Sequence, residues 1–404
     1  MTVFPKAKFA EEKVVSDSGL CISCVPSGAG LKPALSAVPF ASGAPENIKA
    51  VYFAKGINTY FVCAESGVYF SKTNEFFARI ATYRDNVFAF EFLYNDKPCA
   101  VLCMGNGSVR YSAEGFSTVP VNADLCAGAY HCGRLFAIDS DNKNKLVWSE
   151  TGGFTEWGQA LDKGGYLNLD PERGETLDVV CFDGRLVLVR KYGLTVLNMF
   201  GSPENYSVGI TDTACPEIYK NTAVSVGGKL LFFTREGLCS FDGSRIESLK
   251  SDIIADVYDG TCAASYAGRY FLACKSKRLN RAVVLGYCVA DGESCITDCA
   301  AEALCASDGV YAYSGGKVYK LEESDWQYTS EPLGFGTHSR KTLKEITFKG
   351  VADVAVSCGD KTRLYAAARG IVRPGMRGKY FTVKISGEGE VGDIVAKAEV
   401  SVGI

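Results

Sequence analysis

The chain has 404 residues, of which 47% are hydrophobic and 22% are charged, and its formal net charge is −3 at pH 7. This composition describes a globular protein that can bury a large core, and it excludes the strongly basic field that binds nucleic acid or an anionic membrane. No run of sequence approaches the ~20 apolar residues of a membrane-spanning helix. The first residues lack the apolar core of a signal peptide, so we expect no secretion through one.

Cysteine is frequent, and its number is odd. The 17 cysteines are scattered through apolar, strand-like runs such as residues 60–64 and 271–274. A secreted disulfide framework is typical of short chains with an even set of cysteines. We therefore expect cysteine to serve here as a small buried hydrophobe in a reducing cytoplasm, with few or no disulfides.

Residues 1–46 read as an N-terminal arm with two short apolar runs, at 13–15 and 20–25. A ring of sheets leaves an exposed edge wherever it is not closed, and exposed strand edges favour aggregation. We expect the residues after 46 to form such a ring, and we expect this arm to add the strand that closes it.

Three stretches after the arm repeat one pattern, in which a serine follows an aromatic or apolar run and precedes a phenylalanine. The pairs are Ser71 with Phe76, Ser112 with Phe116, and Ser149 with Phe154. The serines are 41 and 37 residues apart, which is the length of one four-stranded blade of a β-propeller. The pattern is loosely similar to the turn box of sialidases, although Thr151 stands where that box has aspartate. We expect the serine hydroxyls to bond turn backbone and to have a structural role.

Between residues 47 and 336, short alternating runs are separated by glycine turns. The turns are Lys55 to Asn58, Asp183-Gly184, Gly227-Gly228, Ala267-Gly268 and Gly315-Gly316. Such turns between β-branched or aromatic runs are the strongest short-range hairpin signal. Helical periodicity is almost absent, so the sequence predicts an all-β protein in which residues 47–336 form a six- or seven-bladed β-propeller.

Residues 337–404 have a different pattern. Strands are predicted at 342–351, 354–358, 363–366, 380–385 and 394–400, with an Arg- and Gly-rich connection at 369–378. We expect a C-terminal β-rich segment, similar to a small β-sandwich, that is appended to the propeller.

The sequence contains no catalytic signature that we recognise: a nucleophile elbow, a phosphate loop and a dinucleotide fingerprint are all missing. His131 lies beside Cys132, but adjacent residues on a strand point to opposite faces, so we expect no direct activation. Asp170, Glu172 and Glu175 cluster in one loop. Glycosidases use such carboxylates, but we expect this cluster to be only solvated.

Metal ligands are also scarce. The chain has two histidines, His131 and His338, and its paired cysteines are Cys21 with Cys24 and Cys295 with Cys299. Neither pair has partners at zinc-knuckle spacing. We therefore expect no metal site, no cofactor and no enzymatic activity.

Residues 214–243 carry a more specific pattern. Pro216 and Ile218 precede Gly227, the apolar run 230–234, Gly237 and Phe241-Asp242-Gly243. This pattern resembles phage tail-stabilisation and tail-nozzle propeller proteins. Residues 145–197 follow the same family's order, and residues 340–346 and 377–387 resemble its closing β-rich segment. The likeness extends over most of residues 125–400.

The resemblance implies a non-enzymatic virion structural protein of a phage tail (a nozzle, hub or stabilisation ring) that is assembled in the host cytoplasm. Such proteins form rings, often hexameric, around the DNA exit channel. The expected partners are further copies of the chain, other tail or portal-adaptor proteins, and DNA in transient, non-specific passage. Basic residues of the C-terminal segment are the expected interface: Arg340, Lys341, Arg369, Arg373 and Arg377.

Two other functions stay open. The degenerate turn boxes and the 12% aromatic residues are also compatible with a carbohydrate-binding or sialidase-like propeller. Sialidase chemistry would need an arginine triad and a Tyr/Glu pair that converge on the propeller axis. The third possibility is a cytoplasmic propeller that serves as an interaction scaffold.

Overall fold

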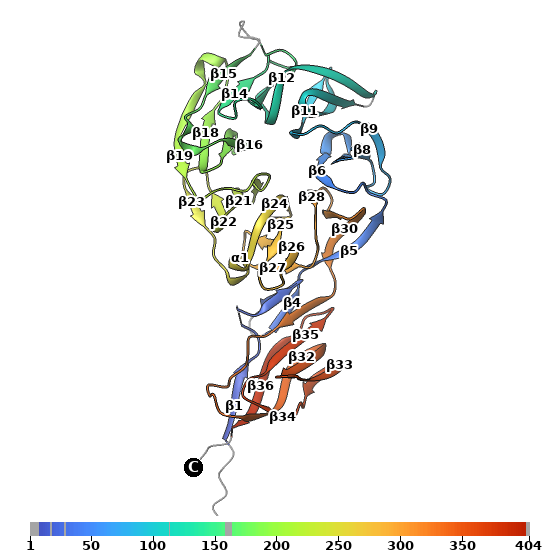
Figure 1. Ribbon diagram of the computed structural model, residues 1–404, viewed down its shortest axis with the longest axis vertical. Helices are drawn as coiled ribbons and strands as arrows, with labels where there is room; N and C mark the ends of the chain where they lie inside the picture. The colour runs from blue at the N-terminus through green and yellow to red at the C-terminus, as the bar shows by residue number, and fades with distance from the viewer. Residues whose placement is uncertain (1–7, 17, 28–29, 113, 158–163, 401–404) are drawn as a thin grey trace, which may run out of the picture.

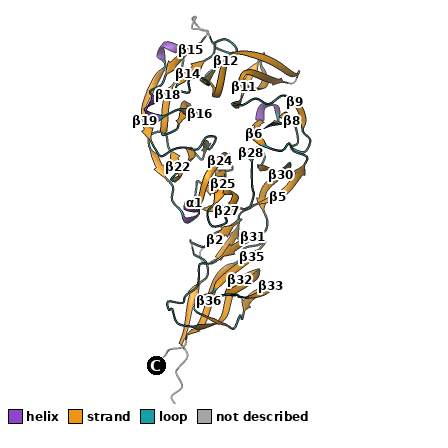
Figure 2. Ribbon diagram, viewed as in Figure 1, coloured by secondary structure: helices purple, strands orange, loops and turns teal. Residues whose placement is uncertain are grey.

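The computed structural model describes residues 8–16, 18–27, 30–112, 114–157 and 164–400. These residues form a ring of β-sheets and an elongated stalk that extends from one side of the ring (Figure 1). The described helices are short (Figure 2): α1 (Asp252–Asp256), η1 (Lys55–Ile57), η2 (Pro171–Arg173) and η3 (Pro203–Asn205). None of them is long and apolar enough to cross a membrane. The prediction of an all-β protein is therefore confirmed.

Four sheets of the ring have four strands each. The first contains β6 (Ile48–Ala54), β7 (Thr59–Ala64), β8 (Gly67–Ser71) and β9 (Ala78–Ala81). The second contains β16 (Thr176–Phe182), β17 (Arg185–Arg190), β18 (Gly193–Asn198) and β19 (Ser207–Ala214). The third contains β20 (Val224–Val226), β21 (Lys229–Thr234), β22 (Gly237–Phe241) and β23 (Ile246–Ser248). The fourth contains β28 (Ala303–Ala306), β29 (Val310–Ser314), β30 (Lys317–Glu323) and β5 (Leu35–Ser42). Four-stranded sheets arranged around an axis define a β-propeller.

The other ring strands belong to larger sheets. A six-stranded sheet contains β10 (Val87–Tyr94), β11 (Lys97–Ser112), β12 (Gly115–His131), β13 (Arg134–Asp139), β14 (Lys145–Trp148) and β15 (Gly165–Asn168). In this sheet β11 pairs with β10 through its first half and with β12 through its second half. A 12-stranded sheet begins in the ring with β24 (Val257–Tyr266), β25 (Arg269–Ser276), β26 (Arg281–Cys288) and β27 (Ser294–Thr297) and continues into the stalk.

The predicted two-residue turns are confirmed as hairpin turns. Asp183-Gly184, Gly227-Gly228, Ala267-Gly268 and Gly315-Gly316 each join two antiparallel strands. Both residues of every pair have positive φ, for example 57° and 75° at Gly227 and Gly228. This conformation matches the right-handed twist of the flanking strands, and glycine adopts it without steric cost.

The two ends of the ring meet through the N-terminal arm. Strand β5 pairs antiparallel with β30, with Leu35 opposite Glu323 and Ser42 opposite Lys317. This pairing brings residues that are almost 300 positions apart in sequence into one sheet (Figure 1). It leaves β30 with a partner on each side, because β29 occupies its other edge.

The stalk is built from both termini of the chain. Its strands are β1 (Lys8–Lys13), β31 (Trp326–Thr329), β32 (Lys341–Cys358), β33 (Lys361–Val372), β34 (Met376–Gly378), β35 (Thr382–Gly387) and β36 (Gly392–Val400). Strand β31 pairs with β35, so the stalk sheet includes residues before 337. These strands belong to the 12-stranded sheet, and the buried apolar side chains of the stalk share one cluster. The sandwich-like packing that we expected for residues 337–404 stays a prediction.

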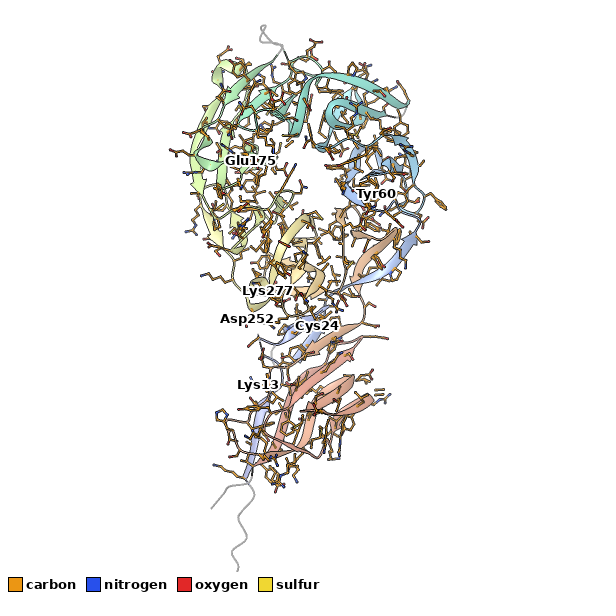
Figure 3. The ribbon with its side chains drawn as sticks, in the orientation of Figure 1. Lys13, Cys24, Tyr60, Glu175, Asp252 and Lys277 are labelled. Carbon is orange, nitrogen blue, oxygen red and sulfur yellow. The ribbon has the colours of Figure 1, made fainter. Side chains whose placement is uncertain are left out.

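One short strand joins the stalk to the ring. Strand β2 (Leu20–Ile22) pairs antiparallel with β31 and parallel with β27. The hairpin of β3 (Cys24–Ser27) and β4 (Gly30–Pro33) follows it, and Cys24 lies where the stalk meets the ring (Figure 3). Because hydrogen bonds run without a break from β24 to β1, the ring and the stalk are parts of one structural unit.

Candidate functional site

The inner strands of the ring surround an axial cavity of about 380 Å³. Its lining comes from β6, β10, β12, β16, β24 and β28, from Tyr83 and Asn86 before β10, and from Lys220, Asn221 and Ala223 before β20. Most of these strands are terminal strands of their sheets. The edge of each such strand that lies outside its own sheet presents backbone N–H and C=O groups toward the axis, and these groups make the cavity polar.

Small residues recur around this cavity. Six of the lining residues are alanines, one on each of six inner segments: Ala50, Ala89, Ala127, Ala223, Ala263 and Ala303. Strands that converge on an axis leave little room for side chains, and alanine fits. We did not find this series from the sequence, although successive members are 38 to 40 residues apart except across β16.

On β16 the lining residues are Leu177, Asp178 and Val179. The carboxylate of Asp178 accepts a hydrogen bond from the backbone N–H of Val179 at 2.8 Å. Burial raises the pKa of Asp178 to about 6, although that hydrogen bond and the charge of Lys220 act in the opposite direction. Asp178 is thus the one acidic side chain among the described residues of the lining.

The described lining of the cavity does not contain the arginine triad that sialidase chemistry needs. It includes no arginine and no histidine among its described residues. Its thiols are Cys126 and Cys262. Burial raises the pKa of both, to about 11 at Cys262, so they stay protonated at neutral pH and are poor nucleophiles.

The three serines of the sequence repeat bond to turn backbone, as we expected. Ser71 accepts from the N–H of Asn74 at 2.9 Å, and Ser112 accepts from the N–H of Glu114 at 3.3 Å. Ser149 accepts from the N–H of Leu135 at 2.9 Å and donates to the carbonyl of Gly153 at 2.7 Å.

The phenylalanines of the repeat do not share one environment. Phe154 is buried, whereas Phe76 is 81% exposed and Phe116 is 40% exposed. Phe116 stacks on Tyr111 with ring centroids 4.4 Å apart. Each copy of the repeat therefore keeps a serine-to-backbone bond, although the partners differ, and the phenylalanines do not keep one environment.

Lys341 is not available to an interface, which corrects our expectation for this residue. Its side chain is buried, and Nζ donates to the carbonyls of Gly334, Thr337 and Lys379, the last two at 2.7 and 2.6 Å. Burial lowers the pKa of Lys341. Alternation along β32 points this side chain inward, and the three carbonyls take the place of water.

The four arginines that we expected at an interface are exposed. Arg340 precedes β32, Arg369 lies on β33, Arg373 follows β33, and Arg377 lies on β34. Arg373 has a long ion pair with Glu345, at 3.9 Å. Residues 361–379 contain six basic residues and no acidic one, so this border of the stalk is positively charged.

Strand β33 pairs with β32, and its other edge has no partner among the described residues. Leu364 on this strand is 78% exposed. A shallow pocket of about 320 Å³ lies beside it, lined by Asp353, Val354, Ala355, Leu364, Tyr365, Ala366, Lys384 and Ser386. The stalk thus offers a free strand edge with apolar and basic side chains.

The cysteine pairs show no metal site. Cys21, Cys24, Cys295 and Cys299 are all buried, and Cys21 and Cys295 help to raise the pKa of Cys24. No group of three or more His, Cys, Asp or Glu side chains in the described part of the chain could hold a metal ion.

Two of the acids in the carboxylate loop have local partners. Asp170 caps η2 by accepting from the N–H of Glu172 at 2.9 Å. Glu175 (Figure 3) pairs with Lys143 at 2.8 Å, and this lysine lowers the pKa of Glu175. His338 bonds to the hydroxyl of Tyr380 on the stalk surface.

His131 and Cys132 contact each other, although we expected their side chains to point to opposite faces. The Sγ of Cys132 lies 3.3 Å from Nε2 of His131. Cys132 belongs to the turn after β12 and has a φ of 47°. The alternation of side chains along a strand does not extend into a left-handed turn residue, and our argument failed for that reason.

Solved structures with similar folds include propellers. The WD40 domain of Pan2 from Neurospora crassa matches over 68% of this chain and 88% of its own length, with a TM-score of 0.48 and 8% identity. An extracellular domain assigned to a hybrid two-component system of B. thetaiotaomicron matches over 85% of this chain, with a TM-score of 0.51 and 8% identity. This chain spans 55% of that domain's length. At this level of identity the likeness shows the fold alone. No protein-family model matches the sequence, and no curated protein matches it.

Proposed function

We propose that the protein is a non-enzymatic structural protein of a phage tail, and that copies of it assemble into a ring around the DNA exit channel. The observation that carries the proposal is the free edge of β33 on a stalk that is continuous with the propeller. A strand of 12 residues with one edge that has no partner among the described residues is a ready template for pairing with another chain. The resemblance of residues 125–400 to tail-nozzle and tail-stabilisation proteins supports the same assignment.

In this proposal, a second copy of the chain binds the free edge of β33. Residues 361–379 are basic, whereas residues 35–336 contain 27 lysines and arginines against 36 aspartates and glutamates. The basic border of one copy would therefore be attracted to the acidic remainder of its neighbour. Contacts of this head-to-tail kind close into a ring when their rotation allows, and a hexamer is the symmetry that the resemblance suggests.

The DNA channel in this proposal lies between the copies. The axial cavity of one propeller holds about 380 Å³, which is far too small for a duplex. Arg340, Arg369, Arg373 and Arg377 are the exposed residues that we assign to the interface, and other tail or portal-adaptor proteins would bind the ends of the assembled ring.

We also propose that the propeller has seven blades. Four are the four-stranded sheets, a fifth is β24–β27, and the six-stranded sheet would supply two more. The axial cavity supports this number, because its lining residues fall within seven separate segments: 49–52, 83–89, 126–128, 177–179, 220–223, 262–263 and 303–304. An experimental structure with fewer or more inner strands around the axis would refute it.

Light scattering with negative-stain microscopy tests the assembly. We expect ring particles of several copies, and we expect Leu364→Asp to shift them toward monomers because it places a buried charge in the interface. Phe76→Asp is the matched control, since Phe76 is 81% exposed and lies on the ring. A protein that stays monomeric at every concentration, and that is missing from virions, would refute the proposal.

One observation favours a second candidate, a carbohydrate-binding propeller. Phe70, Tyr111 and Phe116 form a cluster at the junction of two sheets, with Phe70 and Phe116 ring centroids 5.0 Å apart. Aromatic faces that are partly exposed can stack on sugar rings. A glycan array on the wild type and on Phe116→Ala would test this candidate. If the wild-type protein binds no glycan, the candidate is excluded.

A further inference from the structure

Two of the 17 cysteines are exposed, and they lie together on the ring. Cys132 is in the turn between β12 and β13, and Cys181 is on β16, the inner strand of the neighbouring sheet. The other 15, all in the described part of the chain, are buried or partly buried. The Sγ of Cys181 donates to the carbonyl of Tyr130 at 3.6 Å, and the two thiols influence each other electrostatically. The accessible thiols of the protein are therefore concentrated at one place.

A histidine stands beside one of these thiols. Nε2 of His131 is 3.3 Å from the Sγ of Cys132. The His131 ring is held between aromatic side chains, with its centroid 5.6 Å from that of Phe200 and 6.2 Å from that of Phe136. Burial lowers the pKa of His131, which favours the neutral imidazole. In the tautomer that carries its proton on Nδ1, Nε2 faces the thiol of Cys132 as an acceptor.

We propose that Cys132 is a nucleophilic thiol that reacts with peroxides, and that Cys181 converts the product into a disulfide between neighbouring sheets. The inference rests on the Cys132, His131 and Cys181 cluster and does not depend on the function proposed above. A thiol that is accessible, next to a base and next to a second thiol has the arrangement of a redox-active cysteine.

The chemistry balances with a hydroperoxide as the oxidant. His131 accepts the proton of Cys132, the sulfur attacks the terminal peroxide oxygen, and the O–O bond breaks. The alcohol (water from hydrogen peroxide) leaves with the proton, and Cys132 becomes a sulfenic acid. The sulfur of Cys181 then attacks the sulfur of Cys132, the S–O bond breaks, and water leaves with the proton of Cys181. Two thiols are oxidised to one disulfide, and one peroxide is reduced.

The two cysteines have different roles because their surroundings differ. Cys181 has no histidine contact among its described interactions. The residue is exposed, but the protein partly desolvates its thiol, and this desolvation together with Cys132 raises the pKa of Cys181 to about 11. It therefore stays a thiol until Cys132 is oxidised. Buried cysteines elsewhere should resist oxidation for two reasons. Burial raises the pKa of Cys63 and Cys305 to about 12, and solvent does not reach their thiols.

Alkylation of the intact, folded protein tests the nucleophile. After a short pulse of iodoacetamide and peptide mass spectrometry, Cys132 should react at least about tenfold faster than Cys288 and Cys358, which are partly buried and serve as internal references. His131→Phe keeps an aromatic ring between Phe136 and Phe200, and it should slow Cys132 several-fold. Equal rates at Cys132 and Cys288, or an unchanged rate in His131→Phe, would overturn the proposal.

A second experiment tests the disulfide. One equivalent of hydrogen peroxide should link the peptides of Cys132 and Cys181. In Cys181→Ser the same treatment should leave a sulfenic acid on Cys132 that dimedone traps, and Cys132→Ser should abolish both products. Cys358→Ser is the matched control and should behave like wild type. Dimedone adducts or disulfides spread over other cysteines would refute the assignment.

Discussion

The hydroxyl of Tyr313 donates a hydrogen bond of 2.6 Å to Oδ1 of Asn74, and both side chains are fully buried. Tyr313 lies on β29, and Asn74 follows β8, so the bond joins the last four-stranded sheet of the ring to the first. Asn74 itself is held by Ser71, the first serine of the sequence repeat, through its backbone N–H. The repeat turn therefore takes part in ring closure.

Tyr313→Phe should lower the free energy of unfolding by about 1–3 kcal/mol, because it leaves the carbonyl oxygen of Asn74 buried without a donor. Chemical denaturation followed by tyrosine and tryptophan fluorescence would measure the change. The exposed Tyr192 provides the control, and Tyr192→Phe should change stability by less than about 0.5 kcal/mol. Equal effects of the two substitutions would mean that this bond contributes nothing to closure.

Lys341→Met should destabilise the stalk by about 3 kcal/mol, because it leaves three partly buried carbonyl bonds without their charged donor while keeping the apolar stem. Lys344→Met is the control, since Lys344 is exposed and pairs with Glu399 on the surface; its loss should cost less than about 1 kcal/mol. Thermal unfolding of both variants measures the difference. A Lys341→Met variant as stable as Lys344→Met would contradict the role that we assign to Lys341.

Asp178→Asn should stabilise the protein at pH 7.5 and have little effect at pH 4. The folded-state pKa of about 6 lies above the ordinary value of 3.8, so between these values the folded state binds more protons than the unfolded state. The stability of the wild type therefore falls as the pH rises through this window. The gain at pH 7.5 should be about 1–2 kcal/mol, since partial exposure of Asp178 reduces the full effect of the shift.

Denaturation midpoints at the two pH values would check this prediction. Asp183→Asn is the control, because the Asp183 side chain is 74% exposed in its turn and should show no such pH dependence. A gain for Asp178→Asn that is equal at both pH values would show that its origin is not ionisation.

Gly228→Ala should cost about 1 kcal/mol through the backbone alone. Gly228 has a φ of 75°, and a Cβ at this position would meet no atom within 4 Å. Gly228→Asn should cost less, because asparagine tolerates the left-handed region. The control is Gly389→Ala, at a position without positive φ where a Cβ also meets nothing. If chemical denaturation shows that Gly228→Ala is at least as stable as Gly228→Asn, the turn assignment is wrong.

Local features of this fold could be predicted from the sequence. The glycine turns and the strands beside them follow from φ preferences and from side-chain alternation within a few residues. The bonds of Ser71 to Asn74, Ser112 to Glu114 and Ser149 to Gly153 are local as well. The axial alanines could also be predicted in principle, since their spacing repeats along the sequence.

Residues whose surroundings come from distant segments could not be predicted. Lys341 looks like a surface lysine until the carbonyls of Gly334 and Lys379 close around it. Asp178 looks like an ordinary strand residue until other sheets enclose it. Cys132 was misread because one positive φ at the end of a strand redirects a side chain.

The sequence by itself determined the class of the fold, the length of the repeating unit and the positions of its hairpins, because these depend on backbone preferences and polarity over short stretches. The tertiary structure alone decided that β5 closes the ring beside β30, that β2 bonds in parallel to β27 and so joins the stalk to the ring, and that His131, Cys132 and Cys181 share one site. These contacts depend on how complete sheets pack and which edges remain open, and no local pattern encodes them.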